Sequence, residues 1–332
     1  MKLLPWLLLV ASVVHGAETE PQKAPAELAV AIRYLKPEGV SHSHVYLYRE
    51  DGKLLRQLTK DDSGQDRDPL FSPDGETIVF TREVREAREF WSVEPLGKNL
   101  HKLEAAPEWY AKARSTSYFR YPPDPPADDA AKPADAATEA PPKFTTPDGA
   151  TELILRTVKG DEEDEYNGPG HGKHFILRDV KSGQQREMGK LPGFVGLADL
   201  LALSSDPKVR FFMHPPRRIA FFGLHLDSTA GDTTFAVDLD ARRIVNLSPN
   251  WAAPFPLPGE PAFLTFTFVR YVPIPGSKKT ANCSYLERWD AALNKVRYAA
   301  EGSAAILYGA SIYRSGREPA VLHIRKEPEE EK

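Results

Sequence analysis

This sequence contains histidine and carboxylate side chains whose types and spacing could allow them to bind a metal ion. They include two histidine pairs, His42 with His44 and His171 with His174, and an acidic run at 161–165 precedes the second pair. Imidazole and carboxylate groups together can hold zinc or a harder divalent cation. A divalent metal ion at His171 and His174 is therefore one hypothesis. We favour the plainer interpretation, a solvated acidic loop with surface histidines and no cofactor.

Signatures of covalent or cofactor chemistry are missing from the sequence. It has no Gly-x-Ser-x-Gly elbow, which a serine hydrolase would need to present its nucleophile. The glycine-rich run 168–174 has neither the Lys-Ser/Thr of a phosphate loop nor the dinucleotide fingerprint. Cys283 is the single cysteine, so no internal disulfide can form, and we expect a small buried residue rather than a nucleophile. The carboxylate pair of a glycosidase is defined by a three-dimensional separation, so the sequence alone selects no catalytic residue.

A short segment rich in aromatic and basic residues is the best candidate for binding a partner. Residues 109–121 contain five aromatic and three basic side chains, and binding hot spots favour Trp, Tyr and Arg. The candidate residues are Trp109, Tyr110, Arg114, Tyr118, Phe119 and Arg120. The alternative is that this stretch folds over a sheet and buries its rings.

The overall charge argues against a polyanionic partner. The chain has 332 residues with 43 basic and 47 acidic side chains, which gives a net charge of -4. Nucleic-acid binding normally needs a basic patch or stripe, so we expect no nucleic-acid partner.

The N-terminus has the pattern of an export signal. Residues 1–17 combine an early lysine, an apolar stretch and small residues before a polar segment, and we expect cleavage after Gly16 or Ala17. The apolar stretch is shorter than the roughly 20 residues that a membrane-spanning helix needs. The sequence therefore predicts an exported protein, periplasmic or extracellular, with no membrane span, and we expect a monomer.

The elements that must position these residues are short strands joined by tight turns. The clearest is a turn at Phe71, Ser72, Pro73, Asp74 and Gly75, which lies between two apolar runs. Proline presets the first φ angle of such a turn and glycine accepts a positive one. The β-branched and aromatic run at 77–80 then reads as a buried strand. The sequence therefore predicts an all-β fold.

This turn and its flanks resemble the WD40-like repeat of the TolB type, also called PD40. The motif 71–75 is followed by the strand 78–80 and preceded by residues 56–59, and weaker copies begin near 144, 214, 255 and 300. That family builds β-propeller blades, so the resemblance implies a β-propeller. A β-sandwich with a second domain is the alternative.

The spacing of the repeats predicts the number of blades. Six equivalent turns lie near residues 25, 73, 147, 215, 258 and 301, and blades of this kind take about 40 to 45 residues. We therefore expect six blades across 25–326. The interval before 147 is long because 121–142 is a Pro-, Ala- and Asp-rich tract that we expect to be a disordered insertion. Residues 327–332 read as a charged tail. Because the last unit is short of strands, we expect an N-terminal strand to complete it.

The resemblance also implies a function. It suggests a secreted or periplasmic propeller that lacks catalytic activity and binds a protein through one face and its insertions. TolB itself carries an α/β domain before its propeller, whereas here the first unit begins close to the expected cleavage site, so TolB's partners are not carried over. A carbohydrate-active lyase or hydrolase built on a propeller is the alternative, and it would require His, Arg and carboxylate side chains that converge in the central channel.

Overall fold

A computed structural model describes residues 26–115, 143–159, 171–190, 208–214, 217–226, 231–248, 251–257, 260–315 and 320–322. Within these residues the chain forms antiparallel sheets and one helix, α1 (Glu108–Ser115). This confirms the predicted all-β class. The expected signal segment 1–17, insertion 121–142 and tail 327–332 lie outside the described residues.

Four sheets are meanders of four strands that follow one another in the sequence. The first is β4 (Gln65–Phe71), β5 (Ile78–Val84), β6 (Ala87–Val93) and β7 (His101–Leu103). The second is β8 (Lys143–Thr145), β9 (Thr151–Lys159), β10 (His171–Asp179) and β11 (Gln185–Lys190). The third is β12 (Lys208–His214), β13 (Arg217–Leu226), β14 (Gly231–Asp238) and β15 (Arg243–Ser248). The fourth is β16 (Trp251–Pro256), β17 (Ala262–Pro273), β18 (Thr280–Asp290) and β19 (Lys295–Arg297).

The fifth sheet joins the two ends of the described chain. Its strand order is β21-β20-β1-β2-β3, with β1 (Glu27–Tyr34), β2 (Ser43–Arg49), β3 (Leu54–Gln57), β20 (Ala305–Tyr313) and β21 (Ala320–Leu322). Strand β1 pairs antiparallel with β20, which places Leu28 opposite Ile312. The expectation that an N-terminal strand completes the sheet of the C-terminal strands is confirmed. This pairing covers two strand edges that would otherwise be open.

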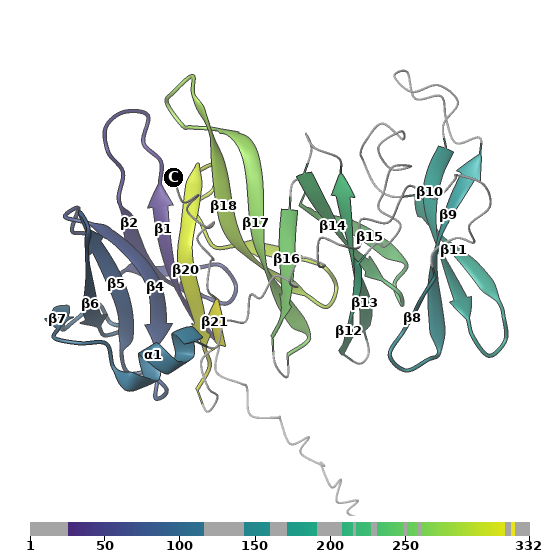
Figure 1. Ribbon diagram of the computed structural model, residues 1–332, viewed down its shortest axis with the longest axis horizontal. Helices are drawn as coiled ribbons and strands as arrows, with labels where there is room; N and C mark the ends of the chain where they lie inside the picture. The colour runs from purple at the N-terminus through teal and green to yellow at the C-terminus, as the bar shows by residue number, and fades with distance from the viewer. Residues whose placement is uncertain are drawn as a thin grey trace, which may run out of the picture.

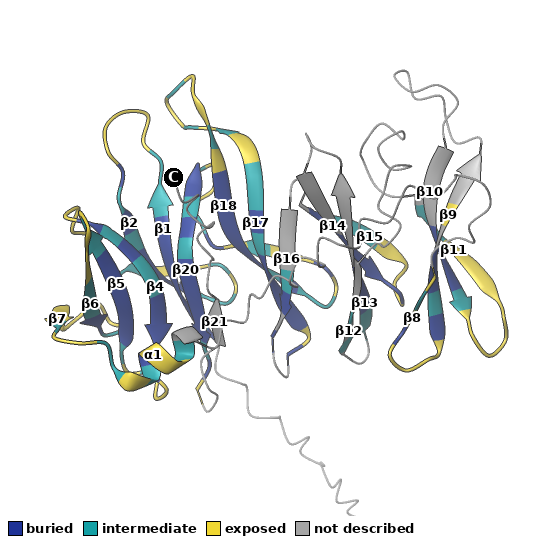
Figure 2. Ribbon diagram, in the orientation of Figure 1, coloured by how far each residue is buried: buried dark blue, intermediate teal, exposed yellow. Residues whose placement is uncertain are grey.

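The sheets lie side by side in a row (Figure 1), with β4–β7 at one end and β8–β11 at the other. Apolar clusters fill each junction, and Figure 2 shows that burial is concentrated in the middle of the strands. In β13, Ile219 packs toward β16–β19 while the adjacent Ala220 packs toward β8–β11, because successive side chains point to opposite faces of a strand. The described residues form five sheets, and the number of six blades stays a prediction.

Helix α1 covers a face of the β4–β7 sheet. Tyr110 is fully buried against Leu70 and Val79, its ring meets that of Phe90 edge-on, and its hydroxyl donates to the Asp68 carbonyl oxygen at 2.9 Å. Part of the long interval between β7 and β8 therefore forms a helix that packs against this sheet.

The turn at Phe71–Gly75 is built by local hydrogen bonds. The Ser72 hydroxyl donates to Asp74 Oδ1 at 2.5 Å and accepts from the Thr77 amide at 3.0 Å. The Gly75 amide donates to the Ser72 carbonyl at 2.8 Å, and Gly75 has φ +76°. Phe71 is buried at the end of β4. These contacts show that the motif closes the turn between β4 and β5.

The weaker copy at 144–149 has the same turn. The Thr146 hydroxyl donates to Asp148 Oδ1 at 2.6 Å and accepts from the Thr151 amide at 3.0 Å. The Gly149 amide donates to the Thr146 carbonyl at 2.8 Å, and Gly149 has φ +67°. The two turns thus share one hydrogen-bond pattern, which supports the repeat inferred from the sequence.

Candidate functional site

Three connections gather at one end of the molecule and form its candidate functional site. They are the β1–β2 loop (35–42), the β3–β4 loop (58–64) and the tip of the β17–β18 hairpin (270–279), which we together call the loop surface. The first and third project beyond the sheets at the top of Figure 1. The His42 ring contacts the Gly64 carbonyl oxygen at 3.2 Å, which joins the first two loops. A Cβ placed on Gly276 would lie 3.7 Å from Pro37, so the hairpin tip touches the β1–β2 loop.

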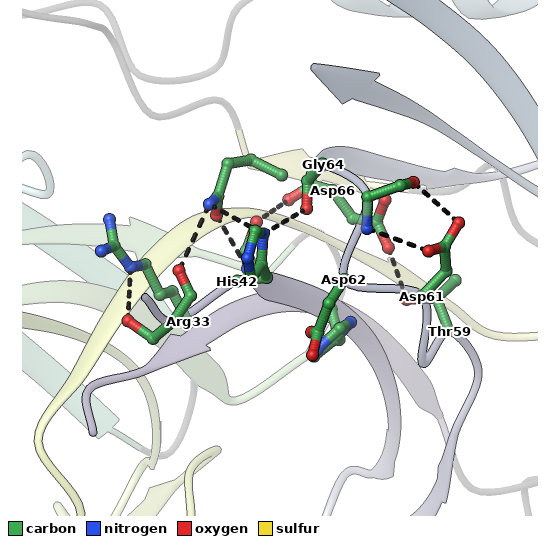
Figure 3. A network of polar contacts seen from close by, with 12 residues as sticks. Arg33, His42, Thr59, Asp61, Asp62, Gly64 and Asp66 are labelled. Carbon is green, nitrogen blue, oxygen red and sulfur yellow. Dashed lines mark hydrogen bonds and ion pairs between the residues drawn. The ribbon is translucent and has the colours of Figure 1, made fainter. Parts of the chain in front are cut away.

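A buried ion pair lies next to the β3–β4 loop and contacts it. Asp66 and Arg82 are almost completely buried, and Arg82 donates from Nε to Asp66 Oδ1 at 2.7 Å and from Nη2 to Oδ2 at 3.1 Å. Thr59 donates to the same carboxylate at 2.5 Å, and the guanidinium lies 4.7 Å from the centre of the Trp91 ring. Burial raises the pKa of Asp66, while Arg82 opposes that rise. Arg82 also reaches Asp61 on the loop at 2.8 Å, and Figure 3 shows Asp61 of the loop together with Thr59 and Asp66. The pair is satisfied within the protein, which indicates a structural role.

The two histidines of the first predicted pair both reach the β3–β4 loop. His42 lies just before β2 and His44 within it, so their rings share a side, as expected for an extended chain. His44 Nε2 is 3.2 Å from Asp62 Oδ1, while its Nδ1 is buried with no hydrogen-bond partner. Neither ring nitrogen of His44 is thus presented to a substrate. Over the described ranges, no group of three or more His, Cys, Asp or Glu residues is arranged to hold a metal ion.

His44 is expected to make stability pH-dependent. Burial lowers its pKa, against the opposing effects of Asp66 and Asp62, while His42 lowers it further. In the unfolded chain the pKa returns toward about 6.5, so the unfolded state binds the proton more readily. The stabilisation that neutral His44 provides is therefore present above the pKa of the unfolded state and is lost as the pH falls through the pKa of the folded state.

When the pH falls from about 7.5 to about 5, we therefore expect the midpoint of thermal unfolding to fall less in the His44→Gln variant than in the parent protein. Thermal unfolding followed by circular dichroism at both pH values measures this. The matched control is His101→Gln, because His101 is exposed at the start of β7. A steep pH profile retained in the His44 variant would contradict the assignment.

A strained and exposed tyrosine marks the β17–β18 hairpin. Tyr271 is 74 % exposed and has φ +57°. Its strand bulges between Val269 and Val272, where the pairing with β18 shifts register. A bulky residue in the left-handed region is unusual and is found mostly where surrounding structure imposes it. The bulge thus presents this ring to solvent.

Charge on the loop surface is unevenly distributed. Lys36 on the β1–β2 loop and Lys278 and Lys279 on the hairpin tip are exposed. On the β3–β4 loop, Asp61 and Asp62 are about half exposed, at 51 % and 58 % of their side chains. The loop surface therefore has a basic side at the hairpin tip and, at the β3–β4 loop, an acidic side where the two aspartates outnumber the exposed Lys60.

The charged residues of a second cluster pair with one another. Arg314 donates from Nε to Glu260 at 2.8 Å and from Nη2 to Glu50 at 2.6 Å, and Arg288 lies within 4 Å of both carboxylates. Glu50 follows β2 and Arg314 follows β20 of the fifth sheet, whereas Glu260 and Arg288 belong to the β16–β19 region. The cluster therefore clamps two neighbouring sheets together.

Three of the six predicted partner-binding residues, Trp109, Tyr110 and Arg114, lie within the described residues. Tyr110 is fully buried, so its assignment to a partner-binding surface is wrong, because α1 turns its ring into the β4–β7 sheet. Trp109 is partly buried beside it, and Arg114 lies on α1. The described residues do not include Tyr118, Phe119 and Arg120.

Residues His171 and His174 lie on β10, and their side chains are outside the described part, so the metal hypothesis stays untested.

Sequence reasoning missed Tyr271 and Val40, which are 74 % and 69 % exposed. The sequence around Tyr271 contains a pattern that could have identified this residue as a candidate for partner contact. An apolar strand leads into Pro273, Pro275 and Gly276 and is followed by Lys278 and Lys279. Proline and glycine mark a turn, and an aromatic residue next to it is a candidate for contact with a partner.

Comparisons with known proteins identify no family. No protein-family model and no curated protein matches the chain. Among solved structures, it is similar to a nidogen/laminin complex, with 8 % identity, 87 % of this chain and 99 % of that chain covered, and a TM-score of 0.31. It is also similar to a protein assigned as TolB from Agrobacterium tumefaciens, with 10 % identity, 89 % and 99 % covered, and a TM-score of 0.21. A third similarity is to the AtxE2 isopeptidase, with 9 % identity and a TM-score of 0.32. It covers 83 % of this chain but 49 % of that one, so the chain spans about half the isopeptidase's length.

Similarities of this strength carry no argument about function. Separately, no helix within the described ranges combines the length and the apolar character needed to span a bilayer.

Proposed function

We propose that this protein is an exported, noncatalytic β-propeller scaffold that binds a protein partner at the loop surface. The observation that carries the proposal is Tyr271, an exposed aromatic side chain held in a strained conformation on a projecting hairpin. Strain of this kind is retained where it serves a function, and exposed tyrosine is a frequent binding anchor.

The polar clusters support binding rather than catalysis. Asp66, Arg82 and His44 are engaged inside the protein, and the Glu260–Arg314 cluster pairs between two sheets. An enzyme of the lyase or hydrolase class would need titratable groups open to a substrate. Within the described residues, these clusters offer a rigid support for the loops above them.

The propeller part of the proposal rests on topology. Four meanders of four consecutive strands, and a fifth sheet that joins the terminal strands, are the organisation that propeller blades use. We propose that the described sheets are such blades and that the chain is a monomer without a cofactor. Export is proposed from the segment 1–17, so intact-mass measurement of the secreted or periplasmic protein should show a start at Ala17 or Glu18.

Site-specific photo-crosslinking in the native host tests the binding function. A photoreactive phenylalanine analogue at Tyr271 is expected to give a discrete adduct with one protein. The control position is Val180, which is 42 % exposed in the β10–β11 turn at the far end of the row of sheets. Mass spectrometry of the adduct identifies the partner. The absence of a protein adduct at Tyr271, or equal adducts at both positions, would overturn the proposal.

A further inference from the structure

The hairpin tip and the β1–β2 loop form a small basic surface around an aromatic anchor. The stretches 35–40 and 270–279 contain the basic residues Lys36, Arg270, Lys278 and Lys279 and a single acidic residue, Glu38. The chain as a whole has a net charge of -4, so this local excess of positive charge departs from the rest of the protein. Opposite charge steers association and selects partners.

The surface is held in place before any partner arrives. The Ile274 amide donates to the Lys279 carbonyl and the Ser277 amide to the Ile274 carbonyl, both at 3.0 Å, which closes the hairpin turn. Pro37 packs beside Gly276 and braces the tip against the β1–β2 loop. A preformed surface loses less conformational entropy on binding. A short segment can therefore bind here without first ordering the loops.

From this geometry we propose that the hairpin tip binds an acidic segment of the partner protein. Tyr271 supplies apolar contact, and Lys36, Lys278 and Lys279 pair with carboxylates of the segment. This inference rests on the proposed function, since it names the chemistry of the partner at the same site.

The neighbouring acidic loop favours a narrow protein segment over an anionic membrane. Asp61 and Asp62 are about half exposed on the same loop surface, and Glu38 is exposed beside Lys36. A flat anionic bilayer would approach these carboxylates as well as the lysines, and like charges repel. A single acidic segment can follow the lysines and avoid the aspartates.

Fluorescence anisotropy with the purified mature protein tests this inference. The probe is a labelled ten-residue peptide of glutamate with leucine at every third position, and its glutamine counterpart is the peptide control. We expect the glutamate peptide to bind at low salt, with about tenfold or greater weakening for the double variant K278E/K279E. The matched protein control is K181E in the β10–β11 turn, where Lys181 is exposed, and it should bind like the parent.

A second variant separates binding from folding. Tyr271→Gly removes the anchor and also relieves the positive φ angle, so we expect weaker peptide binding with an unchanged or higher midpoint of thermal unfolding. A purely structural role for Tyr271 would instead lower the midpoint and leave peptide affinity unchanged. That result would overturn the inference.

The outcomes distinguish this inference from the function on which it rests. If crosslinking at Tyr271 captures a protein but its binding is unaffected by K278E/K279E, the acidic-segment inference fails and the binding function stands. If crosslinking captures no protein, the binding function itself fails. Sedimentation with phosphatidylglycerol vesicles is expected to leave the protein in the supernatant. Co-sedimentation that K278E/K279E abolishes would overturn the inference in favour of a lipid surface.

Discussion

Replacing Arg82 with alanine is expected to lower the free energy of unfolding by about 3–5 kcal/mol. The Arg82 side chain is 1 % exposed and that of Asp66 is fully buried, and the guanidinium binds both carboxylate oxygens. The variant would leave the Asp66 carboxylate buried, with the hydrogen bond from Thr59 retained and both hydrogen bonds from Arg82 lost. A buried charge without its counter-ion is far more costly than a lost surface pair. Urea unfolding followed by tryptophan fluorescence measures the change.

Arg88→Ala is the matched control for this prediction. Arg88 also pairs with a carboxylate of the same sheet, Glu83, at 3.0 Å, but its side chain is 45 % exposed. Exposed pairs typically contribute about 0–1 kcal/mol, so the control should cost little. Equal losses of unfolding free energy in the two variants would show that burial of the Arg82–Asp66 pair is not the cause of the destabilisation.

The pH dependence of the Arg82 variant gives a second check. Burial raises the pKa of Asp66, and the loss of Arg82 removes the main group that lowers it. A carboxyl group with a raised folded pKa contributes stability at low pH that is lost as pH rises through that pKa. The destabilisation by Arg82→Ala should therefore be smaller near pH 4.5 than near pH 7.5. An effect that grows on acidification would contradict this assignment.

Gly75→Ala is expected to destabilise the protein by about 2–5 kcal/mol, from two separate causes. A side chain at φ +76° costs about 1–2 kcal/mol. The added Cβ would also lie 2.2 Å from the Tyr313 ring, and overpacking adds about 1–3 kcal/mol. The ring has little freedom to move away, because it stacks on Phe71 and its hydroxyl donates to the Asp74 carbonyl at 2.7 Å. Urea unfolding measures the change.

The chain supplies its own control at the equivalent turn. Gly149 has nearly the same conformation, φ +67°, but a Cβ there would meet no atom within 4 Å. Gly149→Ala should therefore cost only the backbone part, about 1–2 kcal/mol. The difference between the two variants isolates the contact with Tyr313. If Gly149→Ala is as damaging as Gly75→Ala, the contact between the sheets is not the cause.

Much of the local structure could be predicted because its causes are local. The turn at Ser72–Gly75 is held by hydrogen bonds that span at most five residues, so its sequence is sufficient to specify it. The copy at Thr146–Gly149 repeats these bonds. Proline, glycine and a side-chain acceptor act through the chain's own nearest neighbours.

The candidate site could not be predicted from the sequence in the same way. His44 was identified as one of a pair, but its partner Asp62 and the buried state of its Nδ1 depend on how β2 meets the β3–β4 loop. Tyr110 stood out as an aromatic residue near basic ones, yet it packs into a sheet that begins more than 40 residues earlier. Exposure follows from packing, and the residue type does not determine it.

The sequence by itself determined the all-β class, the Pro-Asp-Gly turns and the need for an N-terminal strand to complete the last sheet. Periodicity and turn chemistry act over a few residues, so they can be read without knowledge of the fold. Only the tertiary structure decided that Arg82 is buried against Asp66, that Tyr110 is covered and that Tyr271 is exposed. It also placed Tyr313 on Gly75, in contact with the turn across 239 residues of sequence. The contact of Tyr313 with Gly75 joins two different sheets, and burial and strain of this kind exist only once the elements have packed together.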